Sequence, residues 1–214
     1  CDNETISSVF DHLSQHQSEI FYQTVLNEGI SCNNPVSHYK YSLFLLFDQQ
    51  KESRNEYIIA EVQKHLKISA SLGYSKSYFM LSRLSHDIIH DDSSSFNYAR
   101  EGSENGDCYS KCLLGHFIYR GIGTESNKLL GFKLMIESGA NELIDFFSTE
   151  IGIGYYMKSL ESKEKHEEFK RKSFEYFKKA FENKKTTATI NNYAICFILG
   201  NGVSKDIEKA KEIL

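Results

Sequence analysis

The chain has 214 residues, which is enough to bury a continuous core within a single repeat domain. Its 29 acidic and 25 basic side chains give a formal net charge of −4, which argues against nucleic acid as the main partner because phosphate binding needs a basic surface. The presence of a single proline favours an all-α chain. No apolar run approaches the length of about 18 residues that a membrane-spanning helix requires.

The predicted elements form one repeat domain over residues 1–214. Apolar residues recur with a helical period in residues 1–30, which we expect to form one or two helices that cap the open end of the array. Helix pairs follow, the fourth with a charged insertion and the fifth only partial. The predicted pairs cover residues 35–73, 74–106, 107–140, 141–184 and 188–214.

The clearest unit begins where one helix ends at Asn105 and Gly106, a pair that favours a left-handed helix cap. Gly115 then interrupts the apolar stripe of the next helix. Because a mid-helix glycine costs about 1 kcal/mol relative to alanine, close approach of another helix is its best explanation. Asn127 is the predicted N-cap of the helix after that.

Two stretches repeat one order of residue types, with a G-x-G loop between two helices. This order resembles the SEL-one-like repeats, relatives of the tetratricopeptide repeats, with the pattern A-x-x-x-L-G-x-x-Y-x-x-G-x-G-V-x-x-D-x-x-K-A. The matching residues of the central unit are Ser110, Leu114, Gly115, Ile118, Gly121, Gly123 and Asn127. Those of the last unit are Thr189, Tyr193, Ala194, Phe197, Gly200, Gly202, Val203, Asp206, Lys209 and Ala210. Repeats of this family close with A-A-x-x-G, a signature that Ser69, Ala70 and Gly73 match. Gly73 and Gly106 lie 33 residues apart, which suits a helix-pair repeat.

The resemblance implies a right-handed α-solenoid of stacked antiparallel helix pairs. In such solenoids the first helix of each pair lines the concave side, and its residues between the packing positions can vary. We therefore expect a non-enzymatic scaffold that binds a protein or peptide in its concave groove, with no cofactor. The expected partner-binding residues are Lys76, Arg83, His86, Tyr109, Cys112, His116, Tyr119, Tyr155, Lys158 and Asn191.

The five cysteines follow no repeat period, so they depart from the disulfide-rich branch of this family. Cys108 and Cys112 lie one helical turn apart, where a disulfide is poorly directed. Cys1, followed by polar residues, resembles the start of a mature bacterial lipoprotein. This implies a lipid anchor at Cys1 and a periplasmic or envelope location. The alternative is a fragment that happens to begin at cysteine, with a cytoplasmic location.

Bacterial relatives of this family serve as envelope adaptors and as immunity proteins that neutralise secreted toxins, and Cys1 favours this branch. The first hypothesis is therefore an immunity protein with a toxin partner. The alternatives are an adaptor without a toxin partner, a eukaryotic scaffold of the protein-quality-control type, and an enzyme, since the disulfide-rich branch has been linked to β-lactam hydrolysis.

Two polar pairs have the spacing of a catalytic or metal site. His86 and His90 have the spacing of two metal ligands on one helix, but their segment is a predicted loop and no third ligand is identifiable. Cys112 and His116 could be read as nucleophile and base, a pairing that also arises by chance. No nucleophile elbow or phosphate-binding glycine loop is present. We expect no catalytic residues and no metal.

Overall fold

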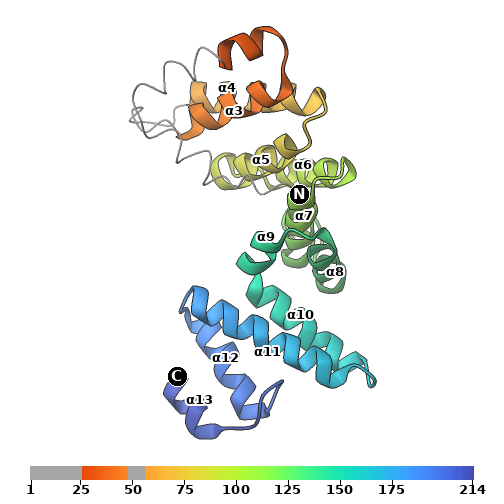
Figure 1. Cartoon of the computed structure of the whole chain (residues 1–214), viewed down its shortest axis with the longest axis vertical. Coiled ribbons are helices and arrows are strands. Elements are labelled where there is room, and N and C mark those ends of the chain that lie inside the picture. Colours follow the sequence, from red (N-terminus) through yellow and green to blue (C-terminus); the bar gives the residue numbers. More distant parts are fainter. Residues whose placement is uncertain (1–25, 48–55) are drawn as a thin grey trace. The chain divides into compact units, whose positions relative to one another are not determined.

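A computed structural model describes residues 26–47 and 56–214, and every regular element in these two ranges is a helix (Figure 1). The prediction of an all-α chain is confirmed. The chain divides into two compact units, Cys1–Ser110 and Lys111–Leu214, with the boundary inside α7. The helices are α3 (Pro35–Phe47), α4 (Glu56–Ser71), α5 (Lys76–Leu84), η1 (Ser85–Ile89), α6 (Asp92–Glu104), α7 (Cys108–Arg120), α8 (Lys128–Ser138), α9 (Asn141–Phe146), α10 (Ser148–Glu161), α11 (His166–Asn183), α12 (Thr187–Leu199) and α13 (Ile207–Ile213).

The first unit is held together by an apolar cluster that joins α3, α4 and α5. Leu43, Leu66 and Leu81, one from each helix, are buried in it. α5 and α6 meet at two buried serines that exchange hydrogen bonds. Ser82 Oγ donates to the backbone carbonyl of Ser95, and Ser95 Oγ donates to that of Ser82, both at 2.8 Å. Because both hydroxyls are satisfied, two helices can pack closely on small side chains without a buried polar penalty.

In the second unit, α7 and α8 pack against each other at Gly115 and Gly131, neither of which has room for a β-carbon. The prediction that Gly115 marks a close helix contact is confirmed. Asn127 caps α8 as predicted, since its Oδ1 accepts a hydrogen bond from the backbone N–H of Leu130 at 3.0 Å. These two local signals fix the hairpin from which one wall of the cleft described below is built.

Two segments differ from the sequence prediction. The stretch from His86 to Asp92, predicted as a loop, starts with the π-helical turn η1, which continues α5 and ends at His90 in the left-handed conformation (φ 60°). The first helix of the pair predicted over 141–184 is instead two helices, α9 and α10. The break is at Phe147, whose φ of −91° and ψ of 25° lie in the bridge region and whose ring is buried. The apolar residues Leu143, Ile144, Phe147 and Ile151 keep the spacing of one continuous helix, so the sequence gives no sign of this break.

The predicted anchor Cys1 and most of the capping segment 1–30 lie outside the described residues, although residues 26–31 are helical. None of the helices in 26–47 and 56–214 combines the length and apolar character that crossing a membrane requires.

Candidate partner-binding surfaces

Several of the predicted residues gather on one side of α5 in the first unit. Lys76, Arg83 and His86 recur at spacings of seven and three, which places them in one helical stripe. Phe79 lies in the same stripe, and the centroid of its ring is 5.7 Å from that of Tyr109 at the start of α7. The other side of α5 is buried in the core. We call these five residues the α5 face.

Arg83 and His86 of the α5 face are paired with neighbouring carboxylates. Arg83 Nε donates to Asp87 Oδ2 at 2.6 Å, and the two side chains are 46% and 40% exposed. His86 Nδ1 lies 2.7 Å from Asp92 Oδ1. Exposed pairs of this kind contribute only about 0–1 kcal/mol each. A partner's carboxylate could therefore replace Asp87 at Arg83 with little loss of stability.

Asp107 fixes the start of α7, and with it the backbone that carries Tyr109. Its Oδ2 accepts a hydrogen bond from the backbone N–H of Ser110 at 2.7 Å. Burial raises the pKa of Asp107, while the hydrogen bonds from Ser110 and the positive charge of Lys76 lower it. Asp107 therefore links Lys76 of α5 to the start of α7, which carries Tyr109.

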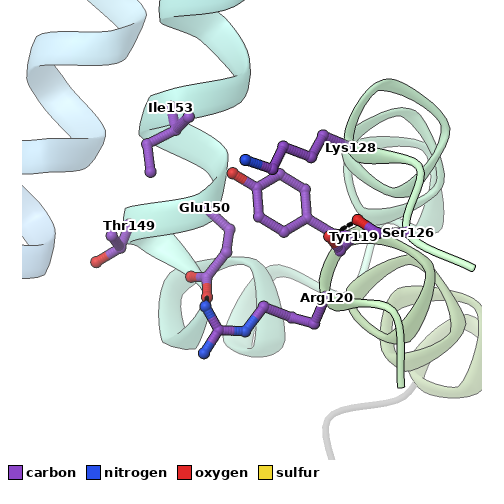
Figure 2. A pocket seen from close by; sticks show the side chains of 7 residues that line it. All are labelled: Tyr119, Arg120, Ser126, Lys128, Thr149, Glu150 and Ile153. Carbon is purple, nitrogen blue, oxygen red and sulfur yellow. Dashed lines mark hydrogen bonds and ion pairs between the residues drawn. The ribbon is translucent and has the colours of Figure 1, made fainter. Parts of the chain in front are cut away.

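The second unit contains an open cleft of about 310 Å³ between the end of α7, the start of α8 and the first turns of α10. Arg120 Nη1 lies 3.9 Å from Glu150 Oε1 across it. The side chain of Tyr119 is 5% exposed, and Figure 2 shows its hydroxyl directed toward α10. Burial first, and then the charge of Glu150, raises the pKa of Tyr119, so the hydroxyl stays protonated. The residues that line the cleft are Tyr119, Arg120, Ser126, Lys128, Thr149, Glu150 and Ile153.

Tyr155 and Lys158, also predicted, belong to an aromatic cluster that joins α8, α10 and α11. The ring of Tyr155 is 5.1 Å from that of Phe132 and 5.7 Å from that of Tyr176, between centroids. Lys158 Nζ lies 5.4 Å from the centroid of Phe132, and Lys172 Nζ lies 5.5 Å from that of Tyr155. Contacts of this type contribute about 0.5–1 kcal/mol at exposed sites. Both predicted residues therefore help to hold three helices together.

The remaining predicted residues lie in different surroundings. Cys112 is fully buried and Tyr119 nearly so, and the expectation that both lie on an open helix face is corrected. Tyr119 is covered because its Cβ faces Gly131 of α8, and an interior helix of a repeat array is covered on more than one side. His116 is half-buried, with its ring stacked on Phe147 at 4.1 Å. Asn191 is exposed on α12.

Sequence reasoning missed the charged residues of the cleft, Arg120, Lys128 and Glu150. Arg120 is the last residue of α7, and Lys128 is the first of α8, so both flank the glycine-rich loop. Their position beside that loop could have drawn attention to them. Glu150 comes 30 residues after Arg120 in the chain, and nothing local connects the two.

No group of three or more metal-ligating side chains is assembled within residues 26–47 and 56–214. Within the same ranges no disulfide links the cysteines, which are Cys32, Cys108, Cys112 and Cys196. The imidazole of His86 is engaged with Asp92, and His90 ends η1 with left-handed backbone, so this pair does not lie on a continuous helix as metal ligands with a spacing of four would.

No protein-family model matches the sequence, and no curated protein matches it either. Among solved structures, the chain is similar to a Sel1 repeat protein from Oxalobacter formigenes, at 16% identity and a TM-score of 0.62 over 97% of this chain and 80% of that one. It is also similar to a protective antigen of uropathogenic Escherichia coli with an SLR fold, at 13% identity and a TM-score of 0.56, over 89% of this chain and 47% of that one. A third likeness is to a sel1 repeat protein from Klebsiella pneumoniae subsp. pneumoniae, at 14% identity and a TM-score of 0.51, over 90% of this chain and 88% of that one.

These likenesses, together with the helix pairs and the glycine contacts between them, define the class of fold. The chain has the SEL-one-like repeat fold, an α-solenoid, as its repeated G-x-G loops predicted.

Proposed function

We propose that the chain is a non-enzymatic scaffold that binds a protein or peptide partner, with the α5 face as a principal contact surface. The observation that carries the proposal is the stripe of Lys76, Phe79, Arg83 and His86 on the side of α5 and η1 that is not fully buried, with Tyr109 of α7 beside Phe79. Tyrosine and arginine are the residue types that dominate interface energetics. The fold supports the proposal, since solenoids present extended surfaces for partners.

The ion pair between Arg83 and Asp87 on the α5 face can be replaced, at little cost in stability, by an ion pair between Arg83 and a binding partner. Arg83 is held by an exposed carboxylate, Asp87, whose contribution to stability is small. Tyr109 and Phe79 are partly buried against each other, so they are already ordered and lose little side-chain entropy on binding. A partner with an apolar anchor next to a carboxylate would match both features.

The experiment compares three versions of the full chain as affinity baits in extract of the native host. The test variant carries Lys76→Ala, Arg83→Ala and Tyr109→Ala. The control variant carries Lys64→Ala, Arg100→Ala and Tyr57→Ala, which removes the same residue types from exposed positions of the same unit. We expect the control variant to retain the partner of the wild-type chain and the test variant to lose it, at a melting temperature within a few degrees of the control.

Retention of the partner by the test variant would contradict the role of the α5 face. Loss of the partner together with a large loss of stability would show that these side chains are core residues rather than contact residues. The identified partner is then titrated against the purified chain, so that the interaction is measured directly.

The finer hypothesis of an immunity protein rests on the resemblance and on Cys1, which lies outside the described residues. It has a direct test. A gene next to this one that encodes a toxin, and protection of sensitive cells when the chain is expressed, would support it. If neither is found, the hypothesis of an adaptor without a toxin partner is favoured.

Two further experiments test the other hypotheses. Labelling with a lipid precursor tests the anchor at Cys1, and turnover of nitrocefin would favour the β-lactam-hydrolysing alternative.

A further inference from the structure

We propose that the cleft of the second unit is a subsite for a carboxylate, held between the ammonium group of Lys128 and the hydroxyl of Tyr119. The inference goes beyond the α5 face and is independent of it, because every residue that carries it lies on α7, α8, α10 or the loop before α8.

The hydroxyl of Tyr119 is the first observation. Its side chain is 95% removed from solvent, yet the hydroxyl opens into the cleft, and among residues 26–47 and 56–214 it has no hydrogen-bond partner. A phenol that is fixed by packing and left with an unused donor is an ordered hydrogen-bonding group. Because its pKa is raised, it donates at neutral pH.

The backbone around Tyr119 holds this donor in place. Ser126 Oγ donates to the carbonyl of Tyr119 at 2.9 Å, which ties the glycine-rich loop back to the end of α7 (Figure 2). The Cβ of Tyr119 faces Gly131, where no larger residue fits, so the ring cannot move toward α8. The side chain of Tyr119 therefore loses little conformational entropy when a ligand binds.

The charges that line the cleft select a single negative charge. Arg120 and Lys128 are cationic and Glu150 is anionic, so the lining carries one net positive charge. Glu150 is placed to hold Arg120, at 3.9 Å, which leaves Lys128 as the cation that a ligand can engage. A carboxylate neutralises this charge, whereas the second negative charge of a phosphate monoester would meet Glu150. Lys128 is also the first residue of α8, where the helix dipole favours an anion.

The test is a nuclear magnetic resonance titration of the full ¹⁵N-labelled chain with N-acetylglycine, which ends in a carboxylate. Its matched control is N-acetylglycinamide, in which a neutral amide replaces the charged group. We expect N-acetylglycine to shift the amide signals of residues 119–130 and 149–153 in a saturable manner, and the amide to leave them unchanged.

Three variants assign the contacts. Lys128→Gln and Tyr119→Phe should each weaken binding about tenfold, since each removes a hydrogen bond to a charged group. Lys133→Gln, on an exposed position of the same helix, should leave the affinity unchanged. Glu150→Gln should tighten binding, because it removes the negative charge from the cleft.

Three results of these titrations would contradict a carboxylate subsite in the cleft. Equal shifts with N-acetylglycinamide, no shifts with either probe, or an affinity unchanged in both Lys128→Gln and Tyr119→Phe would each overturn the proposal. A parallel titration with propionate, a monocarboxylate that lacks a peptide bond, identifies the source of the carboxylate. Tighter binding of N-acetylglycine supports the end of a peptide, and tighter binding of propionate supports a free small acid. Loss of the partner by the α5-face variant bears on neither result, so the two proposals fail separately.

Discussion

Gly115 and Gly131 face each other where α7 crosses α8, and each occupies the space that a side chain on the other would need. A β-carbon at Gly115 would lie 2.7 Å from the carbonyl oxygen of Gly131, and one at Gly131 would lie 2.5 Å from that of Gly115. The atoms in the way belong to the backbone and cannot turn aside. The contact sets the separation of the two helices, and through Tyr119 and Lys128 it sets one wall of the cleft.

The first prediction concerns this contact. In an isolated helix, Gly115→Ala would be favourable by about 1 kcal/mol. Here the clash is with backbone atoms, and overpacking of this kind costs about 1–3 kcal/mol and more where nothing can yield. We expect the steric cost to exceed the propensity gain, so that Gly115→Ala lowers the free energy of unfolding by about 1–2 kcal/mol, as measured by urea denaturation.

The control for this prediction is Lys133→Ala, which truncates an exposed side chain on α8. It should change the free energy of unfolding by no more than about 0.5 kcal/mol. A Gly115→Ala chain that is as stable as wild type, or more stable, would mean that the helices can separate at no cost.

The second prediction concerns pH. His38 and His65 are both buried, and their Nδ1 atoms lie 2.7 Å apart in a hydrogen bond that requires at least one neutral ring. Burial lowers the pKa of His38, and it lowers that of His65 together with the charge of His38. Glu61 opposes the shift at His65, Lys64 adds to it, and the ring of Tyr41 packs edge-on against His65.

The free energy of unfolding falls as pH falls because the unfolded chain takes up more protons than the folded one. Because the folded pKa values lie below the usual histidine value of about 6.5, the unfolded chain binds more protons as pH falls through this range. The stability contributed by the pair is therefore complete above about pH 7 and is lost as pH falls toward the lowered pKa values, by up to about 1.4 kcal/mol per pH unit for each proton. Urea denaturation at several values between pH 5 and pH 7.5 measures the slope.

The variant His38→Gln/His65→Gln should flatten this slope, whatever its absolute stability. His90→Asn is the matched control, since it removes an exposed imidazole at a left-handed position that asparagine tolerates. Its slope should equal that of the wild type. If the double variant kept the full slope, the pair would not be its source.

The third prediction concerns thiol reactivity. Cys196 is 1% exposed, and burial raises its pKa to about 11, although a hydrogen bond from Asn201 opposes the shift. Cys32 is exposed. Since alkylation requires the thiolate, iodoacetamide at pH 8 should label Cys196 about 100-fold more slowly than Cys32 in the native chain. Peptide mapping by mass spectrometry measures the two rates, which should converge in urea. Similar rates in the native chain would show that α12 opens readily.

Local signals in the sequence predicted the features that depend on one or two neighbouring turns. Gly115 could be interpreted as a packing glycine because its cost within a helix demands a reason, and Asn127 as a cap because its side chain acts within three residues. The break at Phe147 could not be predicted, since the apolar residues on either side of it keep the spacing of one helix. The burial of Cys112 and Tyr119 depends on the helices that cover the second side of α7, which the sequence of α7 does not specify. The cleft depends on the contact between Arg120 and Glu150, which belong to different repeats.

Binding of a partner through the α5 face is tested most directly by hydrogen–deuterium exchange of the full chain with and without the identified partner. We predict that the partner slows exchange in α5, η1 and the start of α7, while α6 and α4 change little. Protection confined to other helices, or a complex that forms with no added protection in residues 76–89, would contradict it.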